Sequence, residues 1–308
     1  MKWNSAFFCP VQRILIVLTI SVVSASAQGP FMNGFDLAGA SIPISEIQRG
    51  GPPRDGIPSI DDPQFLDPSK VTFLDVDDPV IGVKIDGVAR AYPLRILVWH
   101  EVVNDEINGK PIVVTYCPLC GTSMVFEGVL QDNGEPLSFG VSGLLFRSDV
   151  LMYDRQTESL WSQLSLKAVS GPMKGAPLKW MASDLINYGS WVRKHRKTGT
   201  REVLSTQTGA DRDYTRNPYT SYNNSNVVWF VVPENRSELA DKSWILGLIQ
   251  GNQAKAYPIN SLTLRGFIRD KFAGRNLEIR IKPGSEELSV LDLDTKELLP
   301  YTRSFWLA

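Results

Sequence analysis

Histidine and cysteine, the side chains that most often bind transition metals, are scarce in this 308-residue chain, which has two of the first and three of the second. Two histidines exclude a site that needs several imidazole ligands. The chain also lacks an excess of positive or negative charge, because its 32 basic residues are balanced by 33 acidic ones. This balance argues against a binding surface for nucleic acid or anionic lipid. No phosphate-binding loop or dinucleotide fingerprint occurs, so we expect no nucleotide cofactor.

Long hydrophobic runs are also missing, except for one near the N-terminus. Lys2 precedes the apolar residues 14–23, and Ala25-Ser26-Ala27 follows with the small-residue spacing of a cleavage site. The apolar run is much shorter than the roughly 20 residues of a membrane-spanning helix. We therefore predict a signal peptide over residues 1–27, export to the periplasm or the extracellular space, and no stable membrane span in the mature protein.

Loss of the signal peptide removes the first cysteine and leaves two thiols, Cys117 and Cys120, in an oxidising compartment. They lie on a turn after the apolar, β-branched run 113–116, which predicts a buried strand. Pro118 fixes φ within the turn, and Gly121 tolerates a positive φ that lets backbone N–H groups point at sulfur. Such a turn is suited to metal binding, to thiol exchange or to a disulfide.

The metal hypothesis adds an imidazole to the two sulfurs. His100 lies 17 residues before Cys117, on the neighbouring predicted hairpin, where pairing of strands would bring it close. Two thiolates and one imidazole suit copper or zinc, and we expect a ring nitrogen within roughly 4 Å of a sulfur. The predicted ligands are therefore Cys117, Cys120 and His100. Candidates for a fourth ligand are Met124, Met152 and His195.

Two alternatives remain open for the same pair of cysteines. In a thiol–disulfide redox protein, an adjacent helix N-terminus would lower the pKa of the attacking thiol. Here the residues after Cys120 have the pattern of a strand, which disfavours exchange chemistry. In a ligand-binding or assembly module, the pair would form a structural disulfide that closes a short loop. No residue is assigned a catalytic role.

Polar residues are dense downstream of the cysteines, and an arginine beside the sulfurs would bind an anionic ligand. The candidate pocket consists of Met124, Arg147, Asp149, Asp154 and Arg155. The alternative for its polar members is turn chemistry and surface ion pairs. Residues 206–232, rich in tyrosine and asparagine, predict a long irregular loop that would cover the pocket or bind a ligand such as a glycan by stacking.

An internal duplication organises the chain. Residues 89–94 match residues 254–259, which places Tyr92 and Tyr257 165 residues apart (257 − 92). The same offset aligns the hairpin turns and strands around them, so residues 80–120 and 245–285 are predicted to form related units. Both tyrosines should be buried at equivalent positions.

The second copy lacks the groups that could react or bind metal. At the same offset, His100, Cys117 and Cys120 align with Arg265, Lys282 and Ser285. The second copy keeps the hairpins but lacks all three groups. This joint absence indicates that the imidazole and the two thiols act together in the first copy.

Strand patterns outnumber helix patterns, so the predicted fold is mainly β, a β-rich α+β protein of internally duplicated β-hairpin units with a few short helices. The predicted division is signal peptide 1–27, N-terminal extension 28–65, first repeat 66–205 with the cysteine site, loop 206–232 and cysteine-free second repeat 233–308.

Several segments resemble one exported bacterial and archaeal family, catalogued as domain of unknown function 3179. The resemblance covers roughly residues 58–305 and implies an extracytoplasmic setting but no reaction. The segments that carry it are Asp78–Val83, Ala91–Leu97, Trp99–Asp105, Thr115–Thr122, Phe139–Leu145 and Met152–Gln163.

Overall fold

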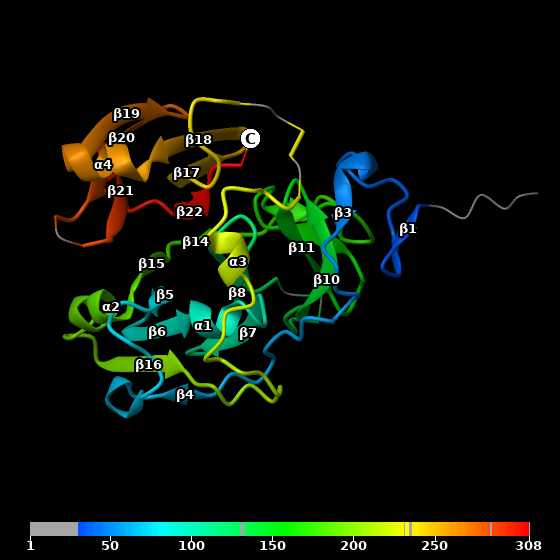
Figure 1. Ribbon diagram of the computed structural model, residues 1–308, viewed down its shortest axis with the longest axis horizontal. Coiled ribbons are helices and arrows are strands. Elements are labelled where there is room, and N and C mark those ends of the chain that lie inside the picture. The colour runs from blue at the N-terminus through cyan, green and yellow to red at the C-terminus, as the bar shows by residue number, and fades with distance from the viewer. Residues whose placement is uncertain are drawn as a thin grey trace, which may run out of the picture.

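The computed structural model describes residues 30–307 except 130, 132, 231, 234, 235 and 284. The predicted signal peptide lies outside the described residues. Within them strands predominate and helices are short, which confirms the predicted mainly β fold (Figure 1). No helix in this part of the chain is long and apolar enough to cross a membrane.

Two units of equal topology form the scaffold, and each begins with a hairpin, a short helix and a second hairpin. The first unit contains β5 (Pro79–Ile85), β6 (Val88–Pro93), α1 (Leu94–Leu97), β7 (Val102–Ile107), β8 (Lys110–Cys117), β9 (Thr122–Glu127), β14 (Trp180–Met181) and β15 (Asp184–Asn187). The second contains β17 (Trp244–Gln250), β18 (Gln253–Pro258), α4 (Ile259–Arg265), β19 (Phe267–Phe272), β20 (Arg275–Ile281), β21 (Leu288–Asp292) and β22 (Thr302–Phe305).

The register of these strands confirms the duplication. Ile81 pairs with Tyr92 in the first unit as Leu246 pairs with Tyr257 in the second, at the predicted offset. Both tyrosines are buried, and each hydroxyl donates to an aspartate that lies 13 residues further along the chain. The tight turns of the hairpins, such as Asp86-Gly87 with both φ values positive, match the right-handed twist of the strands that they join.

An insert distinguishes the first unit from the second. Trp180 pairs with Phe126 as Leu298 pairs with Leu291, so the offset falls from 165 to 118 after β9. The first unit therefore carries 47 additional residues (165 − 118). Their strands are β10 (Phe139–Phe146), β11 (Asp149–Asp154), β12 (Leu160–Ser162) and β13 (Lys167–Ala168), which form a sheet with β3 (Ile47–Arg49).

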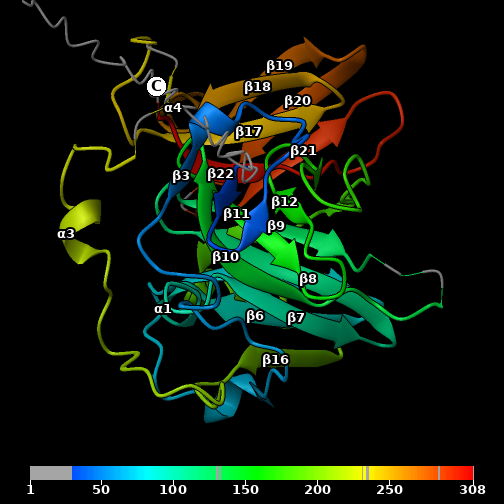
Figure 2. The same cartoon turned by 90° about the vertical axis from the view of Figure 1, so that its right-hand side faces the viewer.

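The remaining elements flank these sheets. α2 (Tyr188–Lys194) follows β15, and β16 (Thr200–Leu204) pairs in parallel with β6 and antiparallel with β4 (Phe65–Leu66). The N-terminal part holds β1 (Phe31–Met32), β2 (Phe35–Asp36) and the 3-10 turns η1 (Ile44–Glu46) and η2 (Pro68–Lys70). The described residues between β16 and β17 are irregular except for α3 (Thr220–Asn223), which lies on one side of the molecule (Figures 1 and 2).

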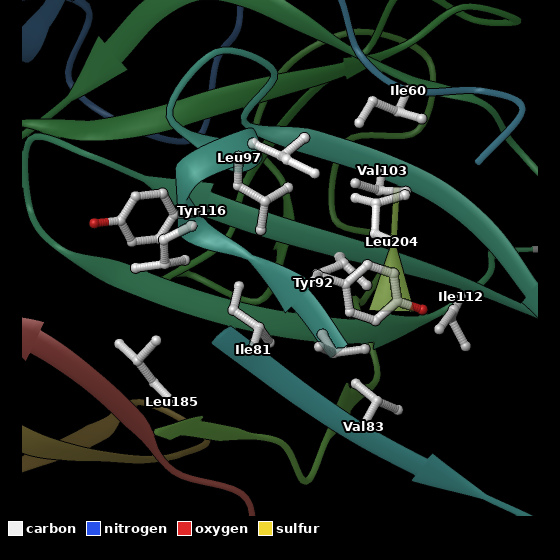
Figure 3. Close-up of a cluster of buried hydrophobic side chains, with 14 of the residues drawn as sticks. Ile60, Ile81, Val83, Tyr92, Leu97, Val103, Ile112, Tyr116, Leu185 and Leu204 are labelled. Atoms are coloured by element: carbon white, nitrogen blue, oxygen red, sulfur yellow. The ribbon is translucent and has the colours of Figure 1, made fainter. Parts of the chain in front are cut away.

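The main core lies within the first unit, where the two hairpins pack face to face around α1. Figure 3 shows Tyr92 beside Val103 and Leu204, and Tyr116 beside Leu97, all of them in one buried cluster. β-Branched and aromatic residues dominate because they fill the space between pleated sheets. The core fixes the β8–β9 turn, and that turn carries both cysteines. The predicted domain boundaries stay a prediction.

Candidate metal centre

The Cys-Pro-Leu-Cys-Gly turn connects β8 to β9. Cys117 ends β8 and pairs with Thr122, the first residue of β9, which confirms the predicted strand on each side of the turn. Gly121 has a φ of +63°, and a Cβ there would lie 3.1 Å from the rings of Phe305 and Trp244. A residue without a side chain is therefore required for two independent reasons.

The tip of the inserted β10–β11 hairpin meets this turn. Arg147 and Ser148 form its two-residue turn, and both have a positive φ, 51° and 65°, although neither is glycine. The turn places Asp149 at the start of β11 and brings the Ser148 carbonyl within 3.6 Å of the Cys117 thiol, which donates to it. Such a left-handed pair of side-chain-bearing residues is strained, and strain of this kind gathers at functional sites.

Two thiols and a carboxylate converge where the two turns meet. One ligand atom each from Cys117, Cys120 and Asp149 lie within 4.8 Å of one another, and no other group of this kind occurs in the described part of the chain. The Cys120 thiol donates to Asp149 Oδ1 at 3.0 Å, and the two sulfurs are not bonded to each other. All three side chains are at most 4% exposed. The cluster is thus buried and able to hold a cation.

Further polar groups orient this cluster. Gln163 from the insert donates to Asp149 Oδ1 at 2.5 Å and accepts from the Thr115 hydroxyl at 2.8 Å. Two buried atoms, Asp149 Oδ2 and Ser148 Oγ, have no hydrogen-bond partner among the described residues. Buried polar atoms nearly always have a hydrogen-bond partner. The lack of one at these two atoms indicates that a ligand or ion binds here.

Burial controls the charge of the cluster. Removal from water raises the pKa of Asp149 to about 6, and the hydrogen bonds from Cys120 and Gln163 only partly oppose this. Burial also raises the pKa of the Cys120 thiol well above its ordinary value, and the neighbouring Cys117 and the Asp149 charge act in the same direction. A thiol of this kind is a poor nucleophile. A bound cation would reverse these shifts because it favours the deprotonated forms.

A second buried carboxylate stands close to the cluster. Glu101 follows α1 with a φ of 59°, and its backbone carbonyl accepts from the Tyr116 N–H at 2.8 Å. Burial raises its pKa to about 8, and the charge of Asp149 contributes to the shift. The hydroxyl of Tyr219 approaches it at 3.5 Å. Sequence reasoning missed Glu101. A carboxylate that lies between a histidine and a strand rich in valine is expected to be buried, and this could have marked Glu101 as a candidate site residue.

His100 does not belong to the cluster, contrary to the predicted set of ligands. Its Nδ1 lies 2.7 Å from the Pro58 carbonyl and its Nε2 lies 2.6 Å from the Tyr214 hydroxyl, so both ring nitrogens are used elsewhere. Burial lowers the pKa of its imidazole. The structure supplies Asp149 as the third group, because the insert reaches the cysteines from another sheet.

The other predicted site residues either pack in the core or make polar contacts away from the sulfurs. Met124 and Met152 are fully buried in an apolar cluster, and His195 lies at the end of α2 against Trp191. Asp154 accepts from Thr157 and Trp161 within its own hairpin. Arg155 binds Asp61 and Ser59 of the N-terminal segment, and Arg147 pairs with Glu46. Only Asp149 of the candidate pocket therefore joins the sulfurs, while Arg147 lines a cavity beside them.

The tyrosine-rich segment covers the cysteine turn, as predicted for a loop over the site. Tyr222 of α3 is fully buried, and its hydroxyl donates to the Leu119 carbonyl at 2.7 Å. The Lys242 ammonium lies 3.3 Å from the centre of the Tyr222 ring. On another side, a cavity of about 580 Å³ reaches Cys120 and Thr122. Of the three clustered residues, only Cys120 lines this cavity.

The fold and the cluster define a class of protein, a duplicated mainly β scaffold in which only one unit bears a buried group of two thiols and a carboxylate. The chain belongs to the family described as "Protein of unknown function (DUF3179)", which matches residues 54–297, well over half of its length. This confirms the family resemblance of the sequence. No curated protein and no solved structure matches the chain.

Proposed function

We propose that the protein binds one transition-metal ion, copper or zinc, through the sulfurs of Cys117 and Cys120 and the carboxylate of Asp149. The observation that carries this proposal is the convergence of two thiols and a carboxylate in a buried place where Asp149 Oδ2 has no hydrogen-bond partner among the described residues. Three anionic ligands cannot be held together away from water without a compensating cation. The cation would stabilise the arrangement that burial alone disfavours.

The ligand types favour a soft or borderline ion. Thiolates select zinc, copper(I) and iron–sulfur clusters, and one carboxylate oxygen is compatible with zinc. Ligands that share one zinc ion at bond lengths near 2.0–2.3 Å lie roughly 3.3–3.8 Å apart. The three atoms, within 4.8 Å of one another, need only small movements to reach that geometry. The neighbouring Ser148 hydroxyl is also buried and has no hydrogen-bond partner among the described residues.

Two features disfavour the thiol–disulfide alternative. The residue after the turn begins a strand, β9, so no helix N-terminus stabilises a thiolate. Burial also raises the pKa of the Cys120 thiol, which opposes the formation of an attacking thiolate in the absence of metal. A redox role would require a reducible disulfide and no bound metal, and the same experiment tests both properties.

We further propose that the protein is exported and acts outside the cytoplasm after removal of residues 1–27. The basic start, the short apolar run and the Ala-Ser-Ala sequence support this proposal. Mass spectrometry of the protein recovered from the periplasm or the medium would give the mature N-terminus. A mature chain that begins at Gln28 is the expected result, and an intact chain retained in the cytoplasm would contradict export.

Elemental analysis tests the metal proposal. The mature protein, expressed in its exported form and purified without chelator, should contain about one zinc or copper ion per chain. Cys117→Ser, Cys120→Ser and Asp149→Asn should each lose most of it. His100→Gln should retain it, because the imidazole makes its contacts elsewhere.

A matched control separates loss of metal from loss of fold. Asp292 of the second unit is also a buried carboxylate, 1% exposed, and it pairs with Arg275, so Asp292→Asn should disturb the fold at least as much as Asp149→Asn while metal is retained. Thiol titration in parallel should find two protected thiols in the metal-loaded protein. A stoichiometric disulfide with no metal in the purified protein would overturn the proposal in favour of the redox or structural alternative.

A further inference from the structure

The two units differ in what covers the outer face of their first hairpin. In the first unit, Val80, Ala89 and Ala91 are fully buried on this face by residues that include Tyr188 and Trp191 of α2. The parallel strand β16 extends the sheet beside β6. This face is therefore shaped to receive an aromatic side chain.

The equivalent face of the second unit is open. The residues at the offset of 165 are Ile245, Ala254 and Ala256, and all three line the cavity of about 580 Å³ that also reaches Cys120. Ala254 is exposed, whereas its counterpart in the first unit is buried. Within the described residues, β18 pairs only with β17 and no helix packs on this face. The cavity is the space that α2 fills in the first unit.

A pair of glycines shows which group occupies that space. A Cβ added at Gly82 would lie 2.8 Å from Cδ1 of Trp191, so the indole rests directly on the glycine. At the equivalent Gly247, the nearest atom to an added Cβ is a methyl carbon of Thr302, and no ring approaches. Among the described residues, an indole therefore lies on the glycine of the first unit, whereas only a methyl group lies beside the glycine of the second.

The wall of this space is aromatic in both units. Tyr188 stacks on Trp191 in the first unit, with ring centroids 6.3 Å apart and planes 15° apart. Residue 306 takes the place of residue 188 at the offset of 118, and it is Trp306, which lines the cavity. Its indole N–H is buried and has no hydrogen-bond partner in the part of the chain that the structure describes, and the Arg236 guanidinium lies 4.9 Å from its ring. A second ring could stack here in the same way.

The described charged residues that line the cavity itself are basic. Among the described residues that line it there is no aspartate or glutamate, while four cations do so: Arg147, Lys167, Arg236 and Lys255. Three of the four pair with carboxylates that lie outside the lining, and Lys167 has no ion pair with a described residue. An anionic group at the mouth of the cavity would be attracted by these side chains.

We propose that this cavity binds a small planar aromatic anion, with its ring on Gly247 against Trp306 and its anionic group among the basic side chains. The ligand would take the position that the Trp191 indole takes in the first unit. Because Cys120 lines the same cavity, the ligand would lie next to the proposed metal centre. The site itself uses none of the three metal ligands for recognition, so it goes beyond the proposed function and is tested separately from it.

Isothermal titration calorimetry of the metal-free mature protein with indole-3-acetate tests this site. The probe joins the ring found in the first unit to a carboxylate, while indole-3-ethanol keeps the ring without charge and acetate keeps the charge without a ring. We expect saturable one-to-one binding of indole-3-acetate, at least about tenfold weaker binding of indole-3-ethanol, and none for acetate. Equal affinity for the charged and uncharged rings, or no saturation with indole-3-acetate, would overturn the proposal.

Variants locate the binding. Ala254→Leu places a side chain in the cavity from an exposed strand position and should weaken binding at least about tenfold. Trp306→Phe should keep binding and Trp306→Ala should lose it, which separates stacking from general damage. Lys167→Gln should weaken binding severalfold, whereas Lys179→Gln, an exposed lysine paired with Glu127, should not. Unchanged affinity in Ala254→Leu would place the ligand elsewhere and contradict the proposal.

One further variant keeps the two proposals apart. Cys117→Ser should bind indole-3-acetate as the unmodified protein does, although it loses the metal. Loss of indole-3-acetate binding in a folded Cys117→Ser protein would contradict a site independent of the metal ligands, whatever the result of the elemental analysis.

Discussion

At the scale of single residues, the site depends on carboxylates whose charge the fold disfavours. Glu101 and Asp149 are both buried, and burial raises the pKa of each, to about 8 and about 6. Neither has a basic partner among the ion pairs of the described residues. In the metal-free protein, Glu101 below about pH 8 and Asp149 below about pH 6 hold protons that the unfolded chain would release. Their protonation links the stability of the fold to pH.

Glu101 gives a prediction with a defined sign. Its folded-state pKa is raised from 4.5 to about 8, so the folded protein retains a proton that the unfolded chain loses above pH 4.5. The free energy of unfolding of the metal-free protein should therefore fall as pH rises from about 4.5 to 8, by up to roughly 3–5 kcal/mol from this group. Asp149 adds a decrease in the same direction, confined to the range below about pH 6.

Urea unfolding of the metal-free protein and of Glu101→Gln at several pH values measures this effect. Glu101→Gln keeps the shape of the side chain without its titration, so the decrease above pH 6 should largely disappear. Glu106→Gln, a change at an exposed glutamate of the same hairpin, serves as the control and should leave the dependence unchanged. The same slope in Glu101→Gln and in the unmodified protein would show that Glu101 does not titrate as described.

Sequence reasoning located two of the three clustered groups and misassigned the third. Cys117 and Cys120 are neighbours along the chain, so their proximity follows from a local turn. Asp149 reaches them only because an inserted hairpin folds back onto that turn, and no local pattern encodes such an approach. His100 was expected from strand pairing, but its ring points to Pro58 and Tyr214. The choice between an imidazole and a carboxylate is made by tertiary packing.

At the scale of secondary-structure elements, the hairpins were the most predictable part. The turn sequences Asp86-Gly87 and Asn108-Gly109 favour left-handed backbone conformations, and both turns have them. The repeated Ala-Tyr-Pro segment then set the register in both units. The insert was harder to place, because its sheet with β3 depends on contacts between residues about 100 positions apart. Local signals therefore specify hairpins but not how hairpins pack.

The cysteine turn offers a test at this scale. Gly121→Ala introduces a Cβ at a φ of +63°, 3.1 Å from the rings of Phe305 and Trp244. Both the backbone strain and the close contact should destabilise the protein, by about 2–3 kcal/mol, and should reduce metal retention because the cysteines shift. Thermal unfolding and elemental analysis measure the two effects.

Gly109→Ala is the matched control for this substitution. Gly109 has a similar φ, +74°, in the β7–β8 turn, but nothing lies within 4 Å of an added Cβ. It should lose only about 1 kcal/mol from backbone strain and should keep its metal. Equal losses of stability and metal in both variants would show that the contact with the second unit does not matter.

At the scale of the whole molecule, the second unit packs against the turn that carries the proposed metal centre. β22 lies against β9 and the cysteine turn, where the Phe305 N–H donates to the Cys120 carbonyl at 2.7 Å. Thr122, next to the turn, shares a 2.8 Å hydrogen bond with Ser304, and Thr302 donates to the Ser123 carbonyl. The duplication has thus placed the unit without cysteines against the cysteine turn of the other.

Because of this contact, we predict that metal binding in the first unit also slows local opening of the second unit. A ligand that binds only the folded state stabilises it, and it slows local opening most strongly where the chain touches the site. Zinc should therefore slow hydrogen exchange at the Phe305 amide, whose acceptor is the Cys120 carbonyl, more than at the Ile279 amide in the β19–β20 hairpin. Hydrogen-exchange mass spectrometry with peptides covering β22 and β20 measures the difference. In Cys117→Ser, zinc should change neither peptide. Equal slowing of both peptides in the unmodified protein would mean that the metal stabilises only the global fold, and that β22 is a passive neighbour of the site.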